Sequence, residues 1–240
     1  MRSRAFCTPG GAIQASPFFV GRDRCTRIKD SRGEWVAWDR LKLRRGERFN
    51  RMPQILSSTQ WTPFPVELVF AFFANPANLP HLMPKWQQAK IENSRLVAAP
   101  IRPVAANPEF RYQSPAAGVG SEMEISFRPV PRLAWRIGWL ARITEFEWNS
   151  HFCDEQVTGP FARWKHRHGI VAESRTDSSG KPVEGTLISD HVEYAVPFGP
   201  LGSLADAVFV RRQMEATFAY RQARLEEILP VAMRQAVRRN

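Results

Sequence analysis

The sequence predicts an α+β domain in which a curved antiparallel sheet packs against one long C-terminal helix. Three observations support this prediction. Residues 120–196 hold short segments of alternating polar and apolar side chains at hairpin spacing. Residues 201–229 form an amphipathic helical pattern, which needs an apolar surface to cover. Helical segments lie before and after the strands rather than alternating with them, which is typical of the α+β class.

The first strand is predicted over residues 54–61, QILSSTQW, and two short helices follow it. After the strand, apolar side chains recur at i, i+3, i+4 and i+7, at Val66, Val69, Phe70 and Phe73. Asn75 can cap a second helix that has Pro76 at its first position, and Pro84 ends this helix.

Further strands follow along the chain. They are predicted over residues 86–98, 120–130, 142–148, 151–157, 161–173 and 186–196, and residues 133–140 form an apolar, aromatic segment between two of them. Residues 99–118 hold four prolines and are predicted to be a long loop. In the last helix, one apolar stripe contains Val210, Met214, Phe218, Leu225, Ile228 and Leu229. Pro230 is expected to end the helix, so that residues 231–240 form a basic tail.

The first 51 residues differ in character from the rest of the chain. They carry 13 Lys or Arg and five acidic residues, a formal charge of +8 out of the chain's +11. They show no sustained periodicity and offer little apolar surface, so we predict a disordered extension or a wrongly assigned start, with Met52 as the natural one. A basic arm that binds nucleic acid or anionic lipid is the alternative.

The composition of the remaining residues argues against several classes of protein. Residues 52–240 carry only +3, so no specific nucleic-acid binding is expected. Cys7, Cys25 and Cys153 form no C-x-x-C pair, which argues against a disulfide framework or a zinc cluster and favours a cytoplasmic protein. No run approaches the roughly 20 apolar residues of a membrane span.

Three stretches carry a resemblance to a known family. They are VFAFFANPANLPHLMP (69–84), FCDEQVTGPFARWKHRH (152–168) and SDHVEYAVPFGPLG (189–202). With them, the chain from Met52 to Leu229 resembles the START-like helix-grip (SRPBCC) superfamily, in particular its polyketide cyclase/dehydrase and coenzyme-Q-binding-like branch. The resemblance implies a ligand-binding domain over residues 52–230, with a cavity beneath the long helix. It implies no cofactor and no metal.

Strand alternation divides the side chains of residues 161–170 between two faces. Trp164, His166 and His168 share one face, and Phe161, Arg163, Lys165 and Arg167 share the other, which we expect to be solvated. In the resembling family the first face lines the cavity. By parity and by resemblance, the expected ligand-binding residues are Phe70, Phe152, Asp154, Gln156, Trp164, His166, His168, Asp190, Tyr194, Met214 and Phe218. The group at Trp135, Trp139 and Trp148 is expected to be either core or an apolar lip of the cavity.

The polar members of this set allow four interpretations. Asp154 and Asp190 can hydrogen-bond His166 and His168 for purely structural reasons. The same groups can orient the polar end of a ligand, or they can act as an acid–base pair. Metal binding would suit these residue types, but no further ligand has a distinctive spacing, so no metal is predicted. In each case, Asp154 or Asp190 should contact a histidine ring nitrogen or Trp164 Nε1.

The function predicted from the sequence is binding or carriage of a small hydrophobic molecule, namely a lipid, an isoprenoid quinone or a polyketide-like compound. The alternative is a polyketide cyclase or dehydratase that uses His166, His168, Asp154 and Asp190 as acid and base. A non-enzymatic role is preferred. A small hydrophobic ligand is the expected partner, and a transient membrane contact is left open.

Overall fold

The structure is a computed structural model, and it describes residues 27–29, 35–37, 53–104, 114–131 and 134–238. The described residues form one antiparallel sheet in which seven strands lie in the order β4-β5-β6-β7-β8-β9-β3. In that order the strands are Lys90–Arg95, Glu122–Phe127, Arg136–Glu147, His151–Thr158, Arg163–Thr176, Pro182–Ala195 and Gln54–Thr62. Two short strands, β1 (Arg27–Lys29) and β2 (Trp35–Ala37), extend the sheet beside β6.

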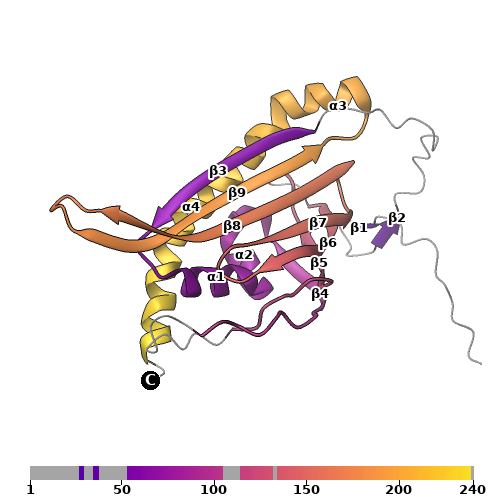
Figure 1. The fold of residues 1–240 in the computed structure, drawn as a ribbon. Helices are drawn as coiled ribbons and strands as arrows, with labels where there is room; N and C mark the ends of the chain where they lie inside the picture. The colour runs from indigo at the N-terminus through magenta and orange to yellow at the C-terminus, as the bar shows by residue number, and fades with distance from the viewer. Residues whose placement is uncertain (1–26, 30–34, 38–52, 105–113, 132–133, 239–240) are drawn as a thin grey trace, which may run out of the picture.

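The helices lie on one side of this sheet. Between β3 and β4 the chain forms α1 (Val66–Ala74), η2 (Pro76–Asn78), α2 (Leu79–Leu82) and η3 (Lys85–Gln87). After β9 it forms α3 (Gly199–Ala205), the π-helical turn η4 (Asp206–Val210) and α4 (Arg211–Arg238). In Figure 1 this last helix runs behind the long strands β3, β9 and β8. The predicted helix-grip architecture, a curved antiparallel sheet around a long C-terminal helix, is therefore confirmed.

The two helices before β4 form for the local reasons that the sequence indicates. The Asn75 side chain accepts a hydrogen bond from the backbone N–H of Ala77 at 3.1 Å, and Pro76 occupies the first helical position, where its missing N–H costs nothing. In α1 the side chains of Leu68, Val69 and Phe70 are all buried. These side chains join the core that includes residues of the sheet, so α1 packs over the strands and forms one wall of the space between them and the C-terminal helix.

Two strand predictions need correction. The strand predicted over residues 142–148 starts earlier, at Arg136, since most of the apolar segment before it belongs to the same strand, β6. The change of pattern at Leu140 and Ala141 marks a shift in the register with β7, because a bulge breaks the alternation without turning the chain. The strand predicted to start at residue 86 starts at Lys90, because Lys85–Gln87 forms a 3₁₀ turn that Gln88 ends in the left-handed region, at φ 46°.

The prediction that Pro230 ends the C-terminal helix is wrong, since α4 continues to Arg238. Proline removes one backbone hydrogen bond and crowds the preceding turn. Leu225, Leu229 and Ala232 are buried on the same side of the helix, before and after the proline. Their packing against the core continues across Pro230 and outweighs the local cost of the proline.

The two halves of the C-terminal helix have different neighbours. Leu225, Leu229 and Ala232 join the main core, which includes Leu68 and Phe70 of α1. The half that contains Val210, Met214 and Phe218 instead packs around Leu56, Val192 and Tyr194 of the sheet. The predicted apolar stripe is thus divided between a filled core and a region that is only partly filled.

Residues 1–26, 30–34 and 38–51 lie outside the described residues, so the prediction that residues 1–51 are an extension stays a prediction. The predicted domain boundary between residues 230 and 231 also stays a prediction. None of the described helices is long and apolar enough to cross a membrane.

Candidate functional site

A cavity of about 520 Å³ lies between the concave face of the sheet and the C-terminal helix. Its wall contains side chains from α1, α2, the strands β5 to β8, and helix residues 209–221. Most of them are apolar, and many are aromatic, including Phe73, Trp139 and Phe218. A largely apolar space of this size, with few polar groups, is typical of sites that bind small hydrophobic molecules.

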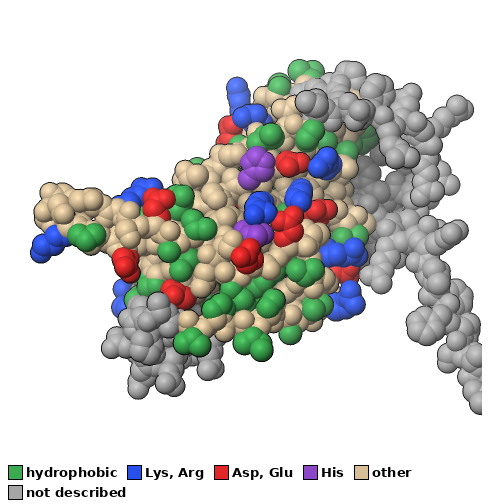
Figure 2. Space-filling view, in the orientation of Figure 1, with side chains coloured by type: hydrophobic (Ala, Val, Ile, Leu, Met, Phe, Trp, Pro, Cys, Tyr) green, Lys and Arg blue, Asp and Glu red, His purple; other side chains and the backbone are tan. Residues whose placement is uncertain are grey.

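The predicted parity of β8 agrees with the structure. Trp164, His166 and His168 line the cavity. The alternate residues carry ion pairs on the outer face: Arg163 with Glu193, and Lys165 and Arg167 with Glu145. Figure 2 shows this mixture of basic and acidic side chains over the middle of the sheet. The outer face is therefore balanced in charge, which does not favour binding of nucleic acid there.

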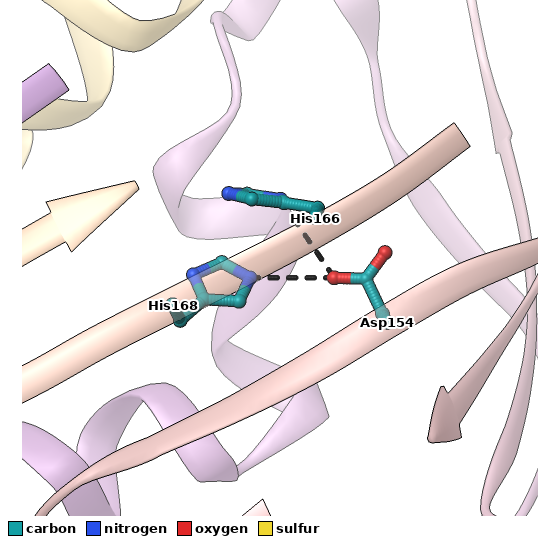
Figure 3. A group of neighbouring side chains, drawn as sticks. All are labelled: Asp154, His166 and His168. Atoms are coloured by element: carbon teal, nitrogen blue, oxygen red, sulfur yellow. Dashed lines mark hydrogen bonds and ion pairs between the residues drawn. The ribbon is translucent and has the colours of Figure 1, made fainter. Parts of the chain in front are cut away.

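Register places the polar side chains opposite one another. Asp154 of β7 pairs with His166 of β8, and His168 pairs with Asp190 of β9. Asp154 Oδ1 lies 3.3 Å from His168 Nε2, and Trp164 Nε1 donates to Asp154 Oδ2 at 3.3 Å. Figure 3 shows both histidines turned toward Asp154 from the neighbouring strand. The predicted contacts of Asp154 are present.

Asp190 forms the other side of this polar cluster. Its Oδ1 lies 3.0 Å from His166 Nε2 and 3.0 Å from His168 Nδ1. Arg221 of α4 reaches down from the helix, with Nη1 3.4 Å from Asp190 Oδ1 and Nη2 3.1 Å from His168 Nδ1. Two carboxylates, two imidazoles and one guanidinium therefore form a continuous network beside a largely apolar cavity.

The charges of this network follow from its neighbours. Burial by itself raises the pKa of Asp190, but Arg221 and hydrogen bonds from the two histidines outweigh it and hold this pKa well below its usual range. Burial also opposes ionisation of Asp154, yet hydrogen bonds and charge from His168 and His166 lower its pKa. Burial, followed by the charge of His168, lowers the pKa of His166. At neutral pH we expect two carboxylates and a neutral His166.

Seven of the predicted ligand-binding residues lie on the cavity wall: Phe152, Asp154, Trp164, His166, His168, Met214 and Phe218. The other four stand behind it. Phe70 packs against the rings of Phe146, Trp148 and Phe152, and Tyr194 packs edge-on against Phe161. Asp190 lies beneath the histidines. Parity indicates which face of a strand a residue occupies, but it does not indicate how deeply the residue is covered.

Gln156 also stands outside the wall, because it braces the turn between β7 and β8. Its Nε2 donates to the carbonyl oxygen of Phe161 at 2.7 Å, and its Oε1 accepts from the Phe161 N–H at 3.3 Å. A Cβ on Gly159 would lie too close to Gln156 Oε1 for an ordinary contact. Glycine at this position therefore allows the amide of Gln156 to reach across the turn.

Phe161 itself was expected on the outer face, and the structure corrects this. It lines the cavity and lies beside Trp164 and Trp139, with ring centroids 5.0 Å and 5.7 Å away. Strand β8 begins only at Arg163, so Phe161 belongs to the turn, where alternation does not apply. Trp135 and Trp139 also line the cavity, whereas Trp148 packs in the core.

Sequence reasoning missed Arg221, Gln87 and Thr217. Arg221 follows Met214 and Phe218 at i+7 and i+3, so it lies within the predicted apolar stripe of the helix. A charged residue inside such a stripe was a usable indication of a buried partner. Gln87 and Thr217 line the cavity, and Gln87 Nε2 donates to Thr217 Oγ1 at 3.3 Å. Neither residue lies in a pattern that could have indicated this position.

Comparison with solved structures gives distant likenesses. No protein-family model and no curated protein match the chain. A solved structure of the Thermus thermophilus protein TTHA0849 is 16% identical, covers 75% of this chain and 99% of its own, and has a TM-score of 0.49. A START superfamily protein from Mycobacterium smegmatis is 12% identical, with 72% and 98% covered and a TM-score of 0.44. The protein Ara h 8.0201 is 12% identical, with 72% and 99% covered and a TM-score of 0.41.

The strand order and the helix across the concave face decide the architecture. The chain has a helix-grip fold. The fold encloses an apolar cavity, whereas membership of the START-like superfamily and of its coenzyme-Q-binding-like branch stays a prediction.

Proposed function

We propose that this helix-grip protein binds or carries a small hydrophobic molecule in the cavity between the sheet and the C-terminal helix. The observation that carries the proposal is a largely apolar space of about 520 Å³ with a polar network on its wall. Ligand sites in proteins commonly have volumes of roughly 300–1,000 Å³. A lipid chain, an isoprenoid quinone and a polyketide-like aromatic compound are the candidate ligands.

Aromatic side chains favour a ligand that has a planar ring. Trp139 and Trp164 meet edge-on, with centroids 4.8 Å apart, and Phe161 lies 5.7 Å from the first and 5.0 Å from the second. Such a cluster offers both ring faces and ring edges to a bound molecule. A quinone or a polyketide-like ring therefore suits this aromatic cluster better than a saturated acyl chain does.

Unpartnered polar atoms indicate how such a ligand is oriented. Among the described residues, Trp139 Nε1, Arg221 Nε and Gln87 Oε1 are buried without a hydrogen-bond partner. All three residues line the cavity. Because buried polar atoms are normally paired, we expect a ligand oxygen to accept from Trp139 or Arg221 and a ligand hydroxyl to donate to Gln87.

This proposal is tested on the full-length protein isolated from its native host. Native mass spectrometry should detect a non-covalent adduct, which organic extraction releases for identification. The emptied protein should then bind a solvatochromic fluorescent probe with one site per chain. Absence of any adduct, together with absence of probe binding by the emptied protein, would refute the proposal.

A cyclase or dehydratase is the second candidate, favoured by the contact of 3.0 Å between His166 Nε2 and Asp190 Oδ1 beside the cavity. A neutral imidazole held by a carboxylate can accept a proton from a polyketide-like chain. Replacement of His166 and His168 by Ala should then abolish turnover of such a substrate while leaving its binding measurable. Full turnover by both variants would exclude these residues from the chemistry.

A transient membrane contact forms part of the proposal. The start of the C-terminal helical segment exposes Leu201, Leu204 and Val208, and Phe198 just before it is exposed as well. The residue after Val208, Phe209, lines the cavity. Exposed Arg211 and Arg212 follow directly and would suit an anionic lipid surface. Leu201→Asp combined with Leu204→Asp should reduce co-sedimentation with vesicles that contain phosphatidylglycerol. Unchanged co-sedimentation would remove this surface from the proposal.

A further inference from the structure

Each histidine of the cluster lies between two carboxylates. On one side, His166 Nδ1 and His168 Nε2 lie 3.7 Å and 3.3 Å from Asp154 Oδ1. On the other side, His166 Nε2 and His168 Nδ1 both lie 3.0 Å from Asp190 Oδ1. The two rings are close together, with centroids 3.8 Å apart. Four ring nitrogens thus face two carboxylate oxygens.

Two imidazoles in their neutral form supply too few donors for these four approaches. Each neutral ring carries one N–H and one lone pair, so the pair supplies two donors for four contacts with carboxylate oxygens. If both N–H groups point to Asp190, where the distances are shortest, two lone pairs face Asp154 Oδ1. Asp154 Oδ1 and the lone pairs of His166 Nδ1 and His168 Nε2 then face one another at the cavity wall. A cation between these three atoms would stabilise the arrangement.

We propose that Asp154 Oδ1, His166 Nδ1 and His168 Nε2 form a binding site for one divalent transition-metal ion. One ligand atom from each of these residues lies within 4.8 Å of the others. Bonds of about 2.0–2.2 Å to nitrogen and oxygen place neighbouring ligand atoms roughly 3–3.5 Å apart. The two distances from Asp154, 3.3 Å and 3.7 Å, are close to that range.

Asp190 would be the orienting carboxylate of this site. Metal-bound histidines usually donate their second ring N–H to a carboxylate or carbonyl, which fixes the ring and its tautomer. Asp190 Oδ1 meets the second nitrogen of both histidines at 3.0 Å. Arg221 Nη2 lies 3.1 Å from His168 Nδ1, and its Nη1 lies 3.4 Å from Asp190. On metal binding, the guanidinium would donate to Asp190 alone.

The donor set selects the class of metal. Two imidazoles and one carboxylate suit zinc or iron(II), whereas magnesium and calcium prefer oxygen ligands. All three ligand residues line the cavity, so the remaining coordination positions open toward its contents. If the proposed function holds, the ligand is a hydrophobic molecule with a hydroxyl, carbonyl or carboxylate oxygen that coordinates the metal. The metal site itself does not rest on that function.

The formal charges agree with such a ligand. Asp154, Asp190 and Arg221 together carry −1, and a divalent ion changes this to +1. A metal-bound oxygen that carries negative charge, such as an enolate, a carboxylate or hydroxide, would neutralise the cluster. With the metal in place, the ring nitrogens that face Asp154 are ligands and no longer proton acceptors. The same nitrogen atoms cannot be metal ligands and free catalytic bases at once, so the two roles of these histidines can be distinguished.

The experiment uses the tag-free full-length chain, stripped with a chelator and titrated with Co²⁺ followed by visible absorption, and with Zn²⁺ followed by calorimetry. We expect one equivalent of each ion per chain and cobalt ligand-field bands. His166→Ala and His168→Ala should abolish these bands. His191→Ala is the matched control, because His191 is exposed on the outer face and should leave binding unchanged.

Two isosteric variants keep the test valid if the alanine variants unfold. In Asp154→Asn the amide oxygen still accepts from Trp164 Nε1, so the fold is retained while cobalt binding is lost. Asp190→Asn should weaken metal affinity about 10–100-fold. Circular dichroism verifies folding in each case. Cobalt binding by the wild type no stronger than by Asp154→Asn would overturn the inference. If the stripped protein binds the hydrophobic probe but no metal, the metal site is wrong and the proposed function stands. If the protein binds metal but no probe, the proposed function is wrong and the metal site stands.

Discussion

Replacing Arg221 by Met tests whether the polar network is held together from the C-terminal helix. Met keeps the length and apolar stem of the side chain but removes the charge beside Asp190. The side chain of Arg221 is 11% exposed and that of Asp190 is 7% exposed, so solvent screens the pair only weakly. The variant therefore leaves a buried carboxylate with two imidazole neighbours and no compensating cation.

The expected cost follows from the contact distance. Two unit charges 3.4 Å apart attract by about 5 kcal/mol at an effective dielectric constant of about 20. Arginine regains solvation in the unfolded state, and Asp190 keeps its hydrogen bonds from His166 and His168. Loss of one partner of a buried pair typically costs about 3–5 kcal/mol, and we expect about 3 kcal/mol here.

The assay is urea unfolding at pH 7 in the presence of a chelator, followed by circular dichroism. Arg212→Met, on the exposed face of the same helix, should change the free energy of unfolding by less than about 0.5 kcal/mol. A loss below about 1 kcal/mol for Arg221→Met would refute the inference that the guanidinium compensates Asp190.

The same variant has a predicted pH dependence. In the wild type the pKa of Asp190 lies well below its usual range, so the stability that it contributes is present above the unfolded pKa and lost only in strong acid. Without Arg221 the folded-state pKa rises. If it rises above the unfolded value, the folded variant binds a proton as pH falls, and the deficit relative to wild type shrinks. A deficit that grows between pH 7 and pH 5 would contradict this explanation.

Three further predictions concern the fold around the site. Leu229→Ala should cost about 2–5 kcal/mol in urea unfolding, because Leu229 is fully buried next to Pro230; a loss below about 1 kcal/mol would contradict packing across the proline. Gly159→Ala should lower the melting temperature, because its Cβ would displace the Gln156 amide that braces the turn, and an unchanged melting temperature would exclude this role. Burial raises the pKa of Cys153 to about 11, so at pH 8 a thiol reagent should label it slowly in the native protein and rapidly after denaturation. Equal labelling rates would show that the thiol is accessible in the native state.

Strand alternation was sufficient to predict the polar side of the cavity. The period of two fixes which side chains of residues 163–170 share a face, and the short turn at Gly159 fixes that Asp154 lies opposite His166. These features are local, so a single sequence contains them. The long amphipathic helix was predictable for the same reason, since its apolar stripe requires a surface to cover.

The remaining features depend on contacts that are distant in the sequence. Arg221 meets Asp190 only because the helix crosses the sheet at one particular rotation. The continuation of α4 past Pro230 depends on the core that Leu229 and Ala232 meet. Phe161 lines the cavity because the strand begins two residues later than its alternation suggested. Local propensity does not contain this information.

The most direct test of ligand binding in the cavity is to fill the cavity with a larger side chain and measure the affinity for a hydrophobic probe. Met214→Trp places a larger side chain on the cavity wall, whereas Ala219→Trp places the same side chain on the exposed face of the helix five residues later. Binding of the solvatochromic probe is titrated with both variants and the wild type, after circular dichroism verifies their folding. We predict that Met214→Trp weakens probe affinity at least about tenfold, a loss of about 1.4 kcal/mol, and that Ala219→Trp leaves it unchanged. Equal probe affinity in all three proteins would contradict binding in this cavity.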